Sequence, residues 1–410
     1  MSTTTMSSSH IAAAAPWADL LPEMCGLVVD RLDALSVIRF PATCADWSAA
    51  SSQTPRLRSG APALLTSGLD PDGYGIEYSV EAGVFALHDV ATGKSFPGEA
   101  EGLKNRTWIG GKDDWLVTTD ERCSVELLNP ITGVRVPLPS FTTMEGVKVP
   151  DHEGLCVAVE NRSHTFQQVA LCQTPAHPGG YLAVALFSSV DGLLAFTAAG
   201  DKCWTPLKNP AGYHPQYTDV TVHKGKVLAV VESGDIYSWA MDGTAAEPTL
   251  VPGPEVHVDP GFKKGFYLAE STGGRLQVVC LYGQHGGHKD KRMWRMVFKD
   301  QWSVWPPRVS LHELDAVAGT WRRVRDLGGD RALFVGANYP FYATVVPGES
   351  KDLQPDCIYV SDLDGSDTGI FDLKLRDDYE YFFVRELSYP VLWGCLQMPM
   401  WYRPTAHSKA

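Results

Sequence analysis

The sequence predicts a mainly β protein, namely a six- or seven-bladed β-propeller preceded by a small module of three helices. Three observations support this prediction. Apolar residues recur at helical spacing near the N-terminus, whereas the chain beyond Pro55 consists of short strand-length runs separated by Gly, Asp, Asn and Pro. The strand-rich part is about 350 residues long, and its units recur loosely at the roughly 40–50 residues typical of propeller blades. No linker rich in Pro, Gly or Ser divides residues 60–400, so one closed ring is favoured over the alternative, a pair of β-sandwich domains.

Composition and charge exclude several classes of partner. The chain has 35 basic and 48 acidic residues and a formal net charge of -13, so it offers no general attraction to nucleic acids or anionic membranes. No run approaches the roughly 18 apolar residues of a membrane span. Residues 1–16 lack the features of a secretory or transit peptide and are expected to be a disordered tail. We therefore expect a soluble protein of the cytoplasm and/or the nucleus, with no nucleic-acid or membrane partner.

Residues 17–55 form the predicted helical module. The spacing of apolar residues predicts a first helix over residues 20–32, in which Pro22 occupies the first turn, where its missing N–H costs nothing. A second helix is expected over residues 34–40 and a third over residues 42–50. So few residues cannot bury the apolar side chains of all three helices among themselves. The module therefore predicts a surface for a partner.

The order of residues in LLPEMCGLVVDRLDALSVIRFPATCADWSAAS, residues 20–51, resembles an F-box. The shared features are the Leu-Pro opening, a Leu-Asp boundary between helices and a Cys-x-x-Trp close. The resemblance implies that this module docks onto the Skp-type adaptor of a cullin-RING ubiquitin ligase. The residues that it implies for adaptor binding are Leu20, Leu21, Pro22, Met24, Val28, Leu32, Leu35, Ile38, Cys44 and Trp47.

Three residues depart from the F-box pattern. Gly26 weakens the first helix, and Pro41 and Asp46 replace residues that are usually helix-friendly and basic. These departures are expected to reduce the affinity for the adaptor. The alternative for residues 17–55 is a structural helical cap on the following domain.

The strand-length runs beyond residue 60 fall into pairs joined by tight turns. They include GVFALHDVATGKSF, DWLVTTDERCSVELLNPITGVRVPLP, DGLLAFTAAGDKCWTPL, DVTVHKGKVLAVVESGDIYSWAM and DRALFVGANYPFYATV. Trp239 alternates with Tyr237 in one of these runs and is expected in the core. Most of the following tryptophans are expected to fill the spaces between blades rather than to form a sugar-binding platform, which is the alternative: Trp115, Trp204, Trp239, Trp294, Trp302, Trp305 and Trp321.

A second resemblance covers most of residues 115–373. ELDAVAGTWRRVRDLGGDRALFVGANYPFYATV and PDCIYVSDLDGSDTGIFDL, with LLNPITGVRVPLP and DVTVHKGKVLAVVESGDIYSWAM upstream, are similar to the plant domain of unknown function 295, the KIB-type propeller. The resemblance implies a plant protein whose residues 60–400 form this propeller and present a platform for another protein.

No motif in the sequence points to catalysis or to a cofactor. GGDRALFVG, residues 328–336, lacks the spacing of a phosphate-binding loop and predicts a turn that enters a buried strand. Residues 362–367 lack the distal glutamate of a calcium loop and predict a hairpin turn. The nine cysteines include no C-x-x-C pair and are expected to be buried and reduced.

The segment GQHGGHKDKR, Gly283 to Arg292, predicts an exposed loop between strands. It is a local positive spot on an acidic protein, and therefore a candidate contact for an acidic segment of a substrate. The alternatives are a solvated connection without a partner and a metal site, for which the loop lacks a full set of ligands. The candidate residues are His285, His288, Lys289, Lys291 and Arg292.

These observations predict a non-catalytic substrate-recognition subunit of an SCF-type (Skp-cullin-F-box) E3 ubiquitin ligase. The F-box would bind the adaptor and, through it, a cullin, while the propeller would bind the protein to be ubiquitinated. The alternative is a propeller scaffold that binds a protein partner without recruiting a ligase.

Overall fold

The computed structural model of the 410-residue chain describes its residues in separate ranges. These are 20–29, 40, 44, 46–47, 62–67, 82–91, 93–144, 168–187, 193–212, 215–241, 247–256, 262–284, 308–345, 353–363, 367–374, 385–386 and 399–404. The chain divides into two compact units, one of Met1–Ser59 with Ala406–Lys409 and the other of Gly60–Thr405 with Ala410. Within the described ranges, no helix is long and apolar enough to cross a membrane.

The first unit contains one described helix, α1 (Pro22–Val29). The predicted first helix is therefore present from Pro22, and its expected continuation to residue 32 lies outside the described residues. The predicted second and third helices, residues 34–40 and 42–50, fall largely outside them as well.

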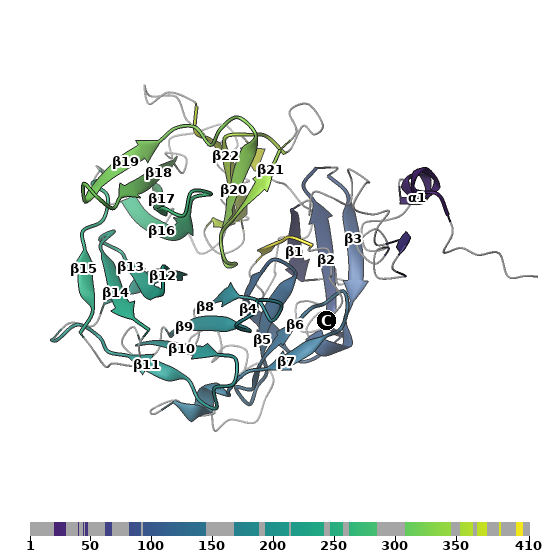
Figure 1. The fold of residues 1–410 in the computed structure, drawn as a ribbon, viewed down its shortest axis with the longest axis horizontal. Coiled ribbons are helices and arrows are strands. Elements are labelled where there is room, and N and C mark those ends of the chain that lie inside the picture. The colour runs from purple at the N-terminus through teal and green to yellow at the C-terminus, as the bar shows by residue number, and fades with distance from the viewer. Residues whose placement is uncertain are drawn as a thin grey trace, which may run out of the picture. The chain divides into compact units, whose positions relative to one another are not determined.

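The second unit forms six β-sheets in the described ranges, arranged as blades around a common centre (Figure 1). The first blade, in spatial order, consists of β25 (Met400–Tyr402), β1 (Ala63–Ser67), β2 (Val84–Asp89) and β3 (Ser95–Glu99). The second blade runs in chain order through β4 (Thr107–Lys112), β5 (Trp115–Thr119), β6 (Val125–Leu128) and β7 (Arg135–Pro137). The short helices η3 (Glu101–Leu103) and η4 (Phe141–Thr143) lie before and after the second blade in the sequence.

The next three blades also follow chain order. The third consists of β8 (Gln168–Gln173), β9 (Leu182–Phe187), β10 (Leu193–Ala198) and β11 (Thr205–Leu207). The fourth consists of β12 (Tyr217–His223), β13 (Lys226–Val231), β14 (Ile236–Ala240) and β15 (Thr249–Val251). The fifth consists of β16 (Phe262–Glu270), β17 (Leu276–Gln284), β18 (Arg308–Asp315) and β19 (Thr320–Val324). The predicted mainly β propeller is confirmed, and the described residues give it six blades.

The sixth blade departs from this order. Its strands lie in the order β21 (Phe341–Thr344), β20 (Arg331–Val335), β22 (Cys357–Leu363), β23 (Asp367–Asp372) and β24 (Arg385–Glu386). β20 and β22 are parallel, with Leu333 opposite Ile358, whereas the other described strand pairs of the propeller are antiparallel. The parallel pairing arises because β21 folds back onto one edge of β20 and the chain then crosses to its other edge.

The ring is closed by strands from opposite ends of the propeller sequence. β25, near the C-terminus, pairs antiparallel with β1, so that Leu65 lies opposite Met400 and Leu64 opposite Trp401. The backbone N–H of Trp401 donates to Asn338 Oδ1 at 3.1 Å, and its indole N–H donates to the carbonyl of Val335 at 2.9 Å. Trp401 therefore attaches the first blade to the sixth.

The outer hairpins of three blades share one turn pattern, an Asp or Asn followed four residues later by a Gly. DVATG, NPITG and DAVAG each join the third and fourth strands, and in each the Gly N–H donates to the carbonyl of the Asp or Asn four residues earlier, at 2.8–2.9 Å. The side chain of that Asp or Asn accepts a further backbone N–H, as in an Asx turn. The glycines Gly93, Gly133 and Gly319 have φ of 67°, 73° and 66°, which disfavours other residues there.

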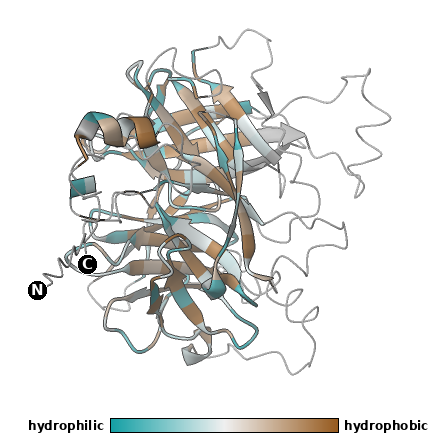
Figure 2. Ribbon diagram, turned by 90° about the vertical axis from the view of Figure 1, so that its right-hand side faces the viewer, coloured by the Kyte–Doolittle hydropathy of each residue, from teal (hydrophilic) through white to brown (hydrophobic). Residues whose placement is uncertain are grey.

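Apolar side chains fill the spaces between neighbouring blades, and Figure 2 shows hydrophobic residues concentrated along the strands. Val117 and Leu127 of the second blade pack in one buried cluster with Phe187 of the third. The prediction that Trp239 belongs to the core is confirmed, because it is only 3% exposed and packs in the cluster between the third and fourth blades.

Three tryptophans link successive blades in the same way. The indole N–H of Trp204 donates to Pro139 O at 2.7 Å, that of Trp239 to Lys208 O at 2.8 Å, and that of Trp321 to Pro252 O at 2.8 Å. Each acceptor carbonyl follows the last strand of the preceding blade. Trp204 and Trp239 are buried, in agreement with a role between the blades, whereas Trp115 and Trp321 are half-buried. Trp294, Trp302 and Trp305 lie outside the described residues.

His88 provides a pH-dependent contribution to the stability of the first blade. It is fully buried on β2, where Nε2 is hydrogen-bonded to Thr66 Oγ1 at 2.9 Å and Nδ1 to Ser95 Oγ at 2.6 Å. Burial lowers the pKa of its imidazole to about 4. The unfolded chain therefore takes up a proton at a higher pH than the folded chain, and stability falls as the pH drops from about 6.5 toward about 4.

We expect His88 to lower the free energy of unfolding by about 3 kcal/mol as the pH drops from about 6.5 to about 4, and to have no such effect above this interval. Urea unfolding of the wild type and of His88→Gln, measured at pH 7.5 and pH 5, checks this expectation. The loss of free energy of unfolding between the two pH values should be smaller in His88→Gln. His312, whose pKa is also lowered to about 4 by burial, contributes equally to both proteins and cancels. Equal losses in the two proteins would contradict the assignment.

Candidate functional site

The helix α1 begins where its sequence allows a helix to begin. The carbonyl of Leu21 accepts the N–H groups of Met24 and Cys25, at 2.9 and 3.0 Å. Pro22 is therefore the first helical residue, a position whose N–H has no helical partner in any case. Glu23 lies in the first turn, where its charge complements the positive end of the helix.

One face of this helix is apolar and exposed. Leu21, Met24, Leu27 and Val28 are 62%, 50%, 66% and 36% exposed. At about 100° per residue, these four side chains cover roughly a third of the helix circumference. Single exposed apolar residues are ordinary, but a contiguous stripe on one helix marks an interaction surface.

Two apolar side chains of the first unit are buried, unlike those of the exposed stripe. Cys25 is 1% exposed and Phe40 3% exposed. Phe40 stacks on Trp47 with ring centroids 4.4 Å apart, and the backbone N–H of Trp47 donates to Cys44 Sγ at 3.4 Å. Burial, with the neighbouring Cys44, raises the pKa of the Cys25 thiol. The four side chains of the stripe therefore remain exposed while Cys25, on the same helix, is buried.

The structure places the predicted adaptor-binding residues as follows. Leu21, Met24 and Val28 are exposed on the stripe, and Leu20, Cys44 and Trp47 are half-buried. Leu27, the most exposed of the four stripe residues, was part of the predicted apolar spacing but not of the set that the F-box resemblance implied. Outside the described residues lie the predicted adaptor residues Leu32, Leu35 and Ile38 and the predicted substrate-contact residues His285, His288, Lys289, Lys291 and Arg292. The predicted loop starts later than residue 283, because Gly283 and Gln284 still belong to β17 and pair with β16.

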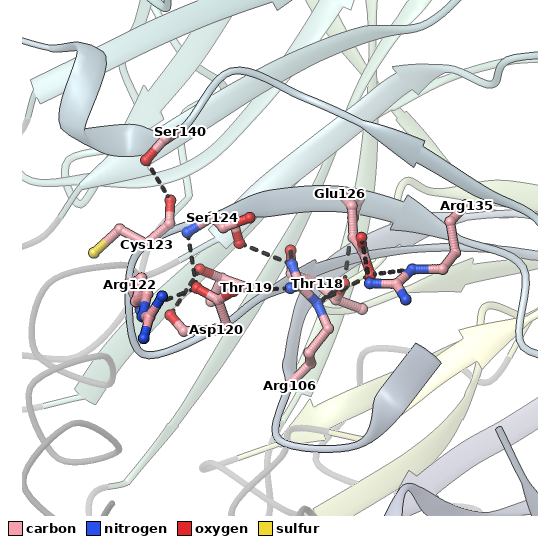
Figure 3. Close-up of polar contacts among 10 residues, drawn as sticks. All are labelled: Arg106, Thr118, Thr119, Asp120, Arg122, Cys123, Ser124, Glu126, Arg135 and Ser140. Carbon is pink, nitrogen blue, oxygen red and sulfur yellow. Dashed lines mark hydrogen bonds and ion pairs between the residues drawn. The ribbon is translucent and has the colours of Figure 1, made fainter. Parts of the chain in front are cut away.

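The propeller contains a cluster of buried and partly buried charges around Arg106 in the second blade (Figure 3). Arg106 Nη1 donates to Asp120 Oδ2 at 3.1 Å, Nη2 to the carbonyl of Ser124 at 2.8 Å, and Nε lies 3.1 Å from Glu126 Oε1. Arg135 donates to both oxygens of Glu126, at 3.0 and 2.8 Å. Burial lowers the pKa of Arg106, but the two carboxylates oppose this shift. Because these charges satisfy one another, the cluster is a structural brace of the blade.

The other predicted motifs have structural places in the described residues. Gly328 and Gly329 both have positive φ and lead into the buried strand β20, as predicted for GGDRALFVG. Leu363 pairs with Asp367 across the antiparallel strands β22 and β23, and residues 364–366, the centre of the turn predicted there, lie outside the described residues. In the ranges that the structure describes, no group of three His, Cys, Asp or Glu residues could hold a metal ion.

Seven of the nine cysteines lie in the described residues, whereas Cys156 and Cys395 lie outside them. Five of the seven are buried, as predicted. The buried cysteines, which form no disulfide, are Cys25, Cys123, Cys172, Cys280 and Cys357. Burial raises the pKa of Cys172 and Cys357 to about 12, so both thiols are held protonated and unreactive. Cys44 is half-buried, and Cys203 is exposed, because it lies in the turn between β10 and β11.

Three comparisons relate this chain to known proteins. It is 24% identical over 403 residues to an Arabidopsis thaliana protein named "Putative F-box protein", and the match covers 95% of this chain and 97% of that protein. Two solved structures are more distant, at 12% identity: YCF48 bound to D1 peptide, with a TM-score of 0.28 over 50% of this chain and 58% of that one, and the Cps50 (Swd1) β-propeller domain of Myceliophteria thermophila, with a TM-score of 0.32 over 76% and 85%. The family model described as KIB1-4 beta-propeller matches residues 84–372. With its six blades and this match over most of its length, the chain belongs to the KIB1-4 β-propeller family.

Proposed function

We propose that this protein is a substrate-recognition subunit of an SCF-type E3 ubiquitin ligase. In this proposal the first unit is an F-box that binds a Skp-type adaptor and through it a cullin, and the propeller binds the protein to be ubiquitinated. The protein itself has no catalytic role in the proposal. A location in the cytoplasm and/or the nucleus is part of the same proposal.

The observation that carries the proposal is the exposed apolar stripe of α1. A helix that leaves Leu21, Met24, Leu27 and Val28 in water gains free energy when a partner covers them, on the order of 1–2 kcal/mol for each side chain. A named F-box relative that matches almost the whole chain supports the same assignment. The proposed adaptor surface extends from this stripe to the remaining residues implied by the F-box resemblance, up to Trp47.

Gly26 offers a matched control on the same helix. It lies roughly opposite the stripe, and a Cβ added there would have nothing within 4 Å. Gly26→Ala should therefore raise the helix propensity by about 1 kcal/mol without touching the proposed surface. We expect this variant to bind the adaptor as well as the wild type or better.

Replacing Leu21 and Leu27 by alanine should weaken adaptor binding by on the order of 100-fold, because two apolar contacts are removed while the helix propensity is kept. Isothermal calorimetry of the full-length variants with a Skp-type adaptor measures the effect. The melting temperature of the propeller should not change. Undiminished affinity in Leu21→Ala/Leu27→Ala would contradict the proposed surface, and failure of the wild type to bind any adaptor would favour a scaffold that recruits no ligase.

The proposal assigns to the propeller the binding of the protein to be ubiquitinated, which we call the client. The segment Gly283–Arg292 remains a proposed contact on sequence grounds, with Lys289, Lys291 and Arg292 as the steering charges.

A further inference from the structure

The inner strands of the propeller end together on one side of the ring. β4, β8, β12 and β16 are each the edge strand of their sheet, and they surround the centre of the propeller (Figure 1). Lys112 is the last residue of β4 and Glu270 the last of β16. The Lys112 ammonium interacts electrostatically with Asp113, Cys172, Arg403 and Glu270, which places these groups around it. We call this set, with Tyr339, the channel mouth.

The carboxylates at and near the channel mouth already have partners. Asp113 accepts from Arg403 Nε at 2.8 Å, and its carbonyl accepts the Arg403 backbone N–H at 3.0 Å. Glu270 Oε2 lies 2.9 Å from His223 Nδ1. Asp219 accepts the backbone N–H groups of Val220 and Leu268, at 2.8 and 2.7 Å.

Lys112 differs from these groups. Its ammonium lies 3.4 Å from the centroid of the Tyr339 ring, and no carboxylate of the described residues forms an ion pair with it. Lys112 is half-buried, and this burial lowers the pKa of its amine. A cation–π contact compensates only part of the cost of taking an ammonium out of water.

The ring beneath the ammonium is held in place by two contacts. The backbone N–H of Tyr339 donates to Gly111 O at 2.7 Å, and its hydroxyl is hydrogen-bonded to the side chain of Thr221. Two residues before Lys112, the backbone of β4 lies directly against that of β8: a Cβ added to Gly110 would lie only 1.9 Å from Val169 O. A ligand at Lys112 would therefore stay at the mouth and not pass between these two strands.

We propose that the channel mouth binds one carboxylate of the client protein, an aspartate or glutamate side chain that pairs with the Lys112 ammonium above the Tyr339 ring. Such a pair supplies the charged acceptor that the described residues do not give this ammonium. A single negative charge fits better than a phosphate dianion, because the mouth also holds the carboxylates of Asp113 and Glu270. The identity of the ligand as a client rests on the proposed function, but the binding of the carboxylate does not.

The probe is a set of dodecapeptides selected from a random phage-displayed library on the immobilised full-length protein. Each selected peptide is then synthesised in its original form and in versions in which each Asp is replaced by Asn or each Glu by Gln. We expect every selected peptide to contain an acidic residue whose replacement weakens binding about tenfold. The same replacement should have no effect on binding to Lys112→Met, which keeps most of the lysine stem. Lys202→Met, an exposed lysine between β10 and β11, is the matched control and should behave as the wild type.

A second measurement does not depend on the variants. A limiting amount of an acetylating reagent should acetylate Lys112, and mass spectrometry measures the extent. The acidic peptide should protect Lys112 from acetylation, whereas the peptide with the amide replacement should not. Lys202 should stay reactive in both cases. Peptides that bind wild type and Lys112→Met equally, that need no acidic residue, or that bind tighter with phosphoserine would each overturn the proposal, as would a selection that yields no binder. Adaptor calorimetry on Lys112→Met separates the two hypotheses: adaptor affinity should be unchanged, whereas Leu21→Ala/Leu27→Ala should lose the adaptor and keep the peptide.

Discussion

Replacing Trp401 by alanine is expected to lower the free energy of unfolding of the propeller by about 3–5 kcal/mol. Trp401 is 1% exposed, and its ring packs against Phe334, with centroids 5.1 Å apart, in the cluster between the sixth and first blades. Alanine would leave a cavity where the first and sixth blades of the propeller meet. It would also remove the indole N–H that donates to the carbonyl of Val335. Urea or thermal unfolding of the full-length protein measures the effect.

Trp321 provides the control for this prediction. It carries the same kind of indole bond, to Pro252 O, but it is half-buried on the outer strand β19. We expect Trp321→Ala to cost only about 1–2 kcal/mol, because little of its surface is lost from a core. A Trp401→Ala protein that is no less stable than Trp321→Ala would show that the closure does not depend on this side chain.

Replacing Arg106 by leucine is expected to cost about 3–5 kcal/mol, because the variant leaves Glu126 and Asp120 without their shared cation. The Arg106 side chain is 8% exposed and that of Glu126 is 11% exposed, so water cannot easily replace the lost partner (Figure 3). Equilibrium unfolding in urea at pH 7 measures the loss.

The double variant Arg106→Leu/Glu126→Leu tests the physical reason. Removing both charges leaves Asp120 without Arg106 and Arg135 without Glu126, but both of these side chains reach water. Arg106→Leu alone also leaves the buried Glu126 without one of its two cations, so the double variant should lose less stability than the single one. Losses that simply add would mean that the two side chains do not compensate each other's burial. Lys226→Leu, at an exposed position of β13, is a suitable control for the loss of a positive charge.

Local features of the fold could be predicted from the sequence because they depend on neighbouring residues. The start of α1 at Pro22 and its apolar stripe follow from helical spacing over a few turns. The repeated outer turn, DVATG, NPITG and DAVAG, depends only on an Asx side chain and a glycine four residues later. This pattern recurs in three blades and is therefore a signal of the blade repeat that can be read from the sequence alone.

Features that join distant segments could not be predicted in this way. The sequence predicts that Trp204, Trp239 and Trp321 fill the spaces between blades, but it does not predict their indole hydrogen bonds. The acceptor carbonyl of each bond belongs to the preceding blade, so the bond depends on how the blades pack. Lys112 has no distinguishing pattern in the sequence, since a lysine at the end of a strand is ordinary. Its significance comes from the cation–π contact with Tyr339, a residue that lies between β20 and β21 of the sixth blade and is therefore distant from Lys112 in the sequence.

The sequence by itself determined that the chain is a helical module followed by a ring of short antiparallel strands, because strand alternation, turn residues and helical spacing are properties of a few consecutive residues. Only the tertiary structure decided that there are six blades, that β25 closes the ring on β1 and that β20 lies parallel to β22. These pairings carry no local signature. They are selected by the twist of the sheets and by the apolar faces of all the blades together, which must close the ring without leaving a core between blades unfilled.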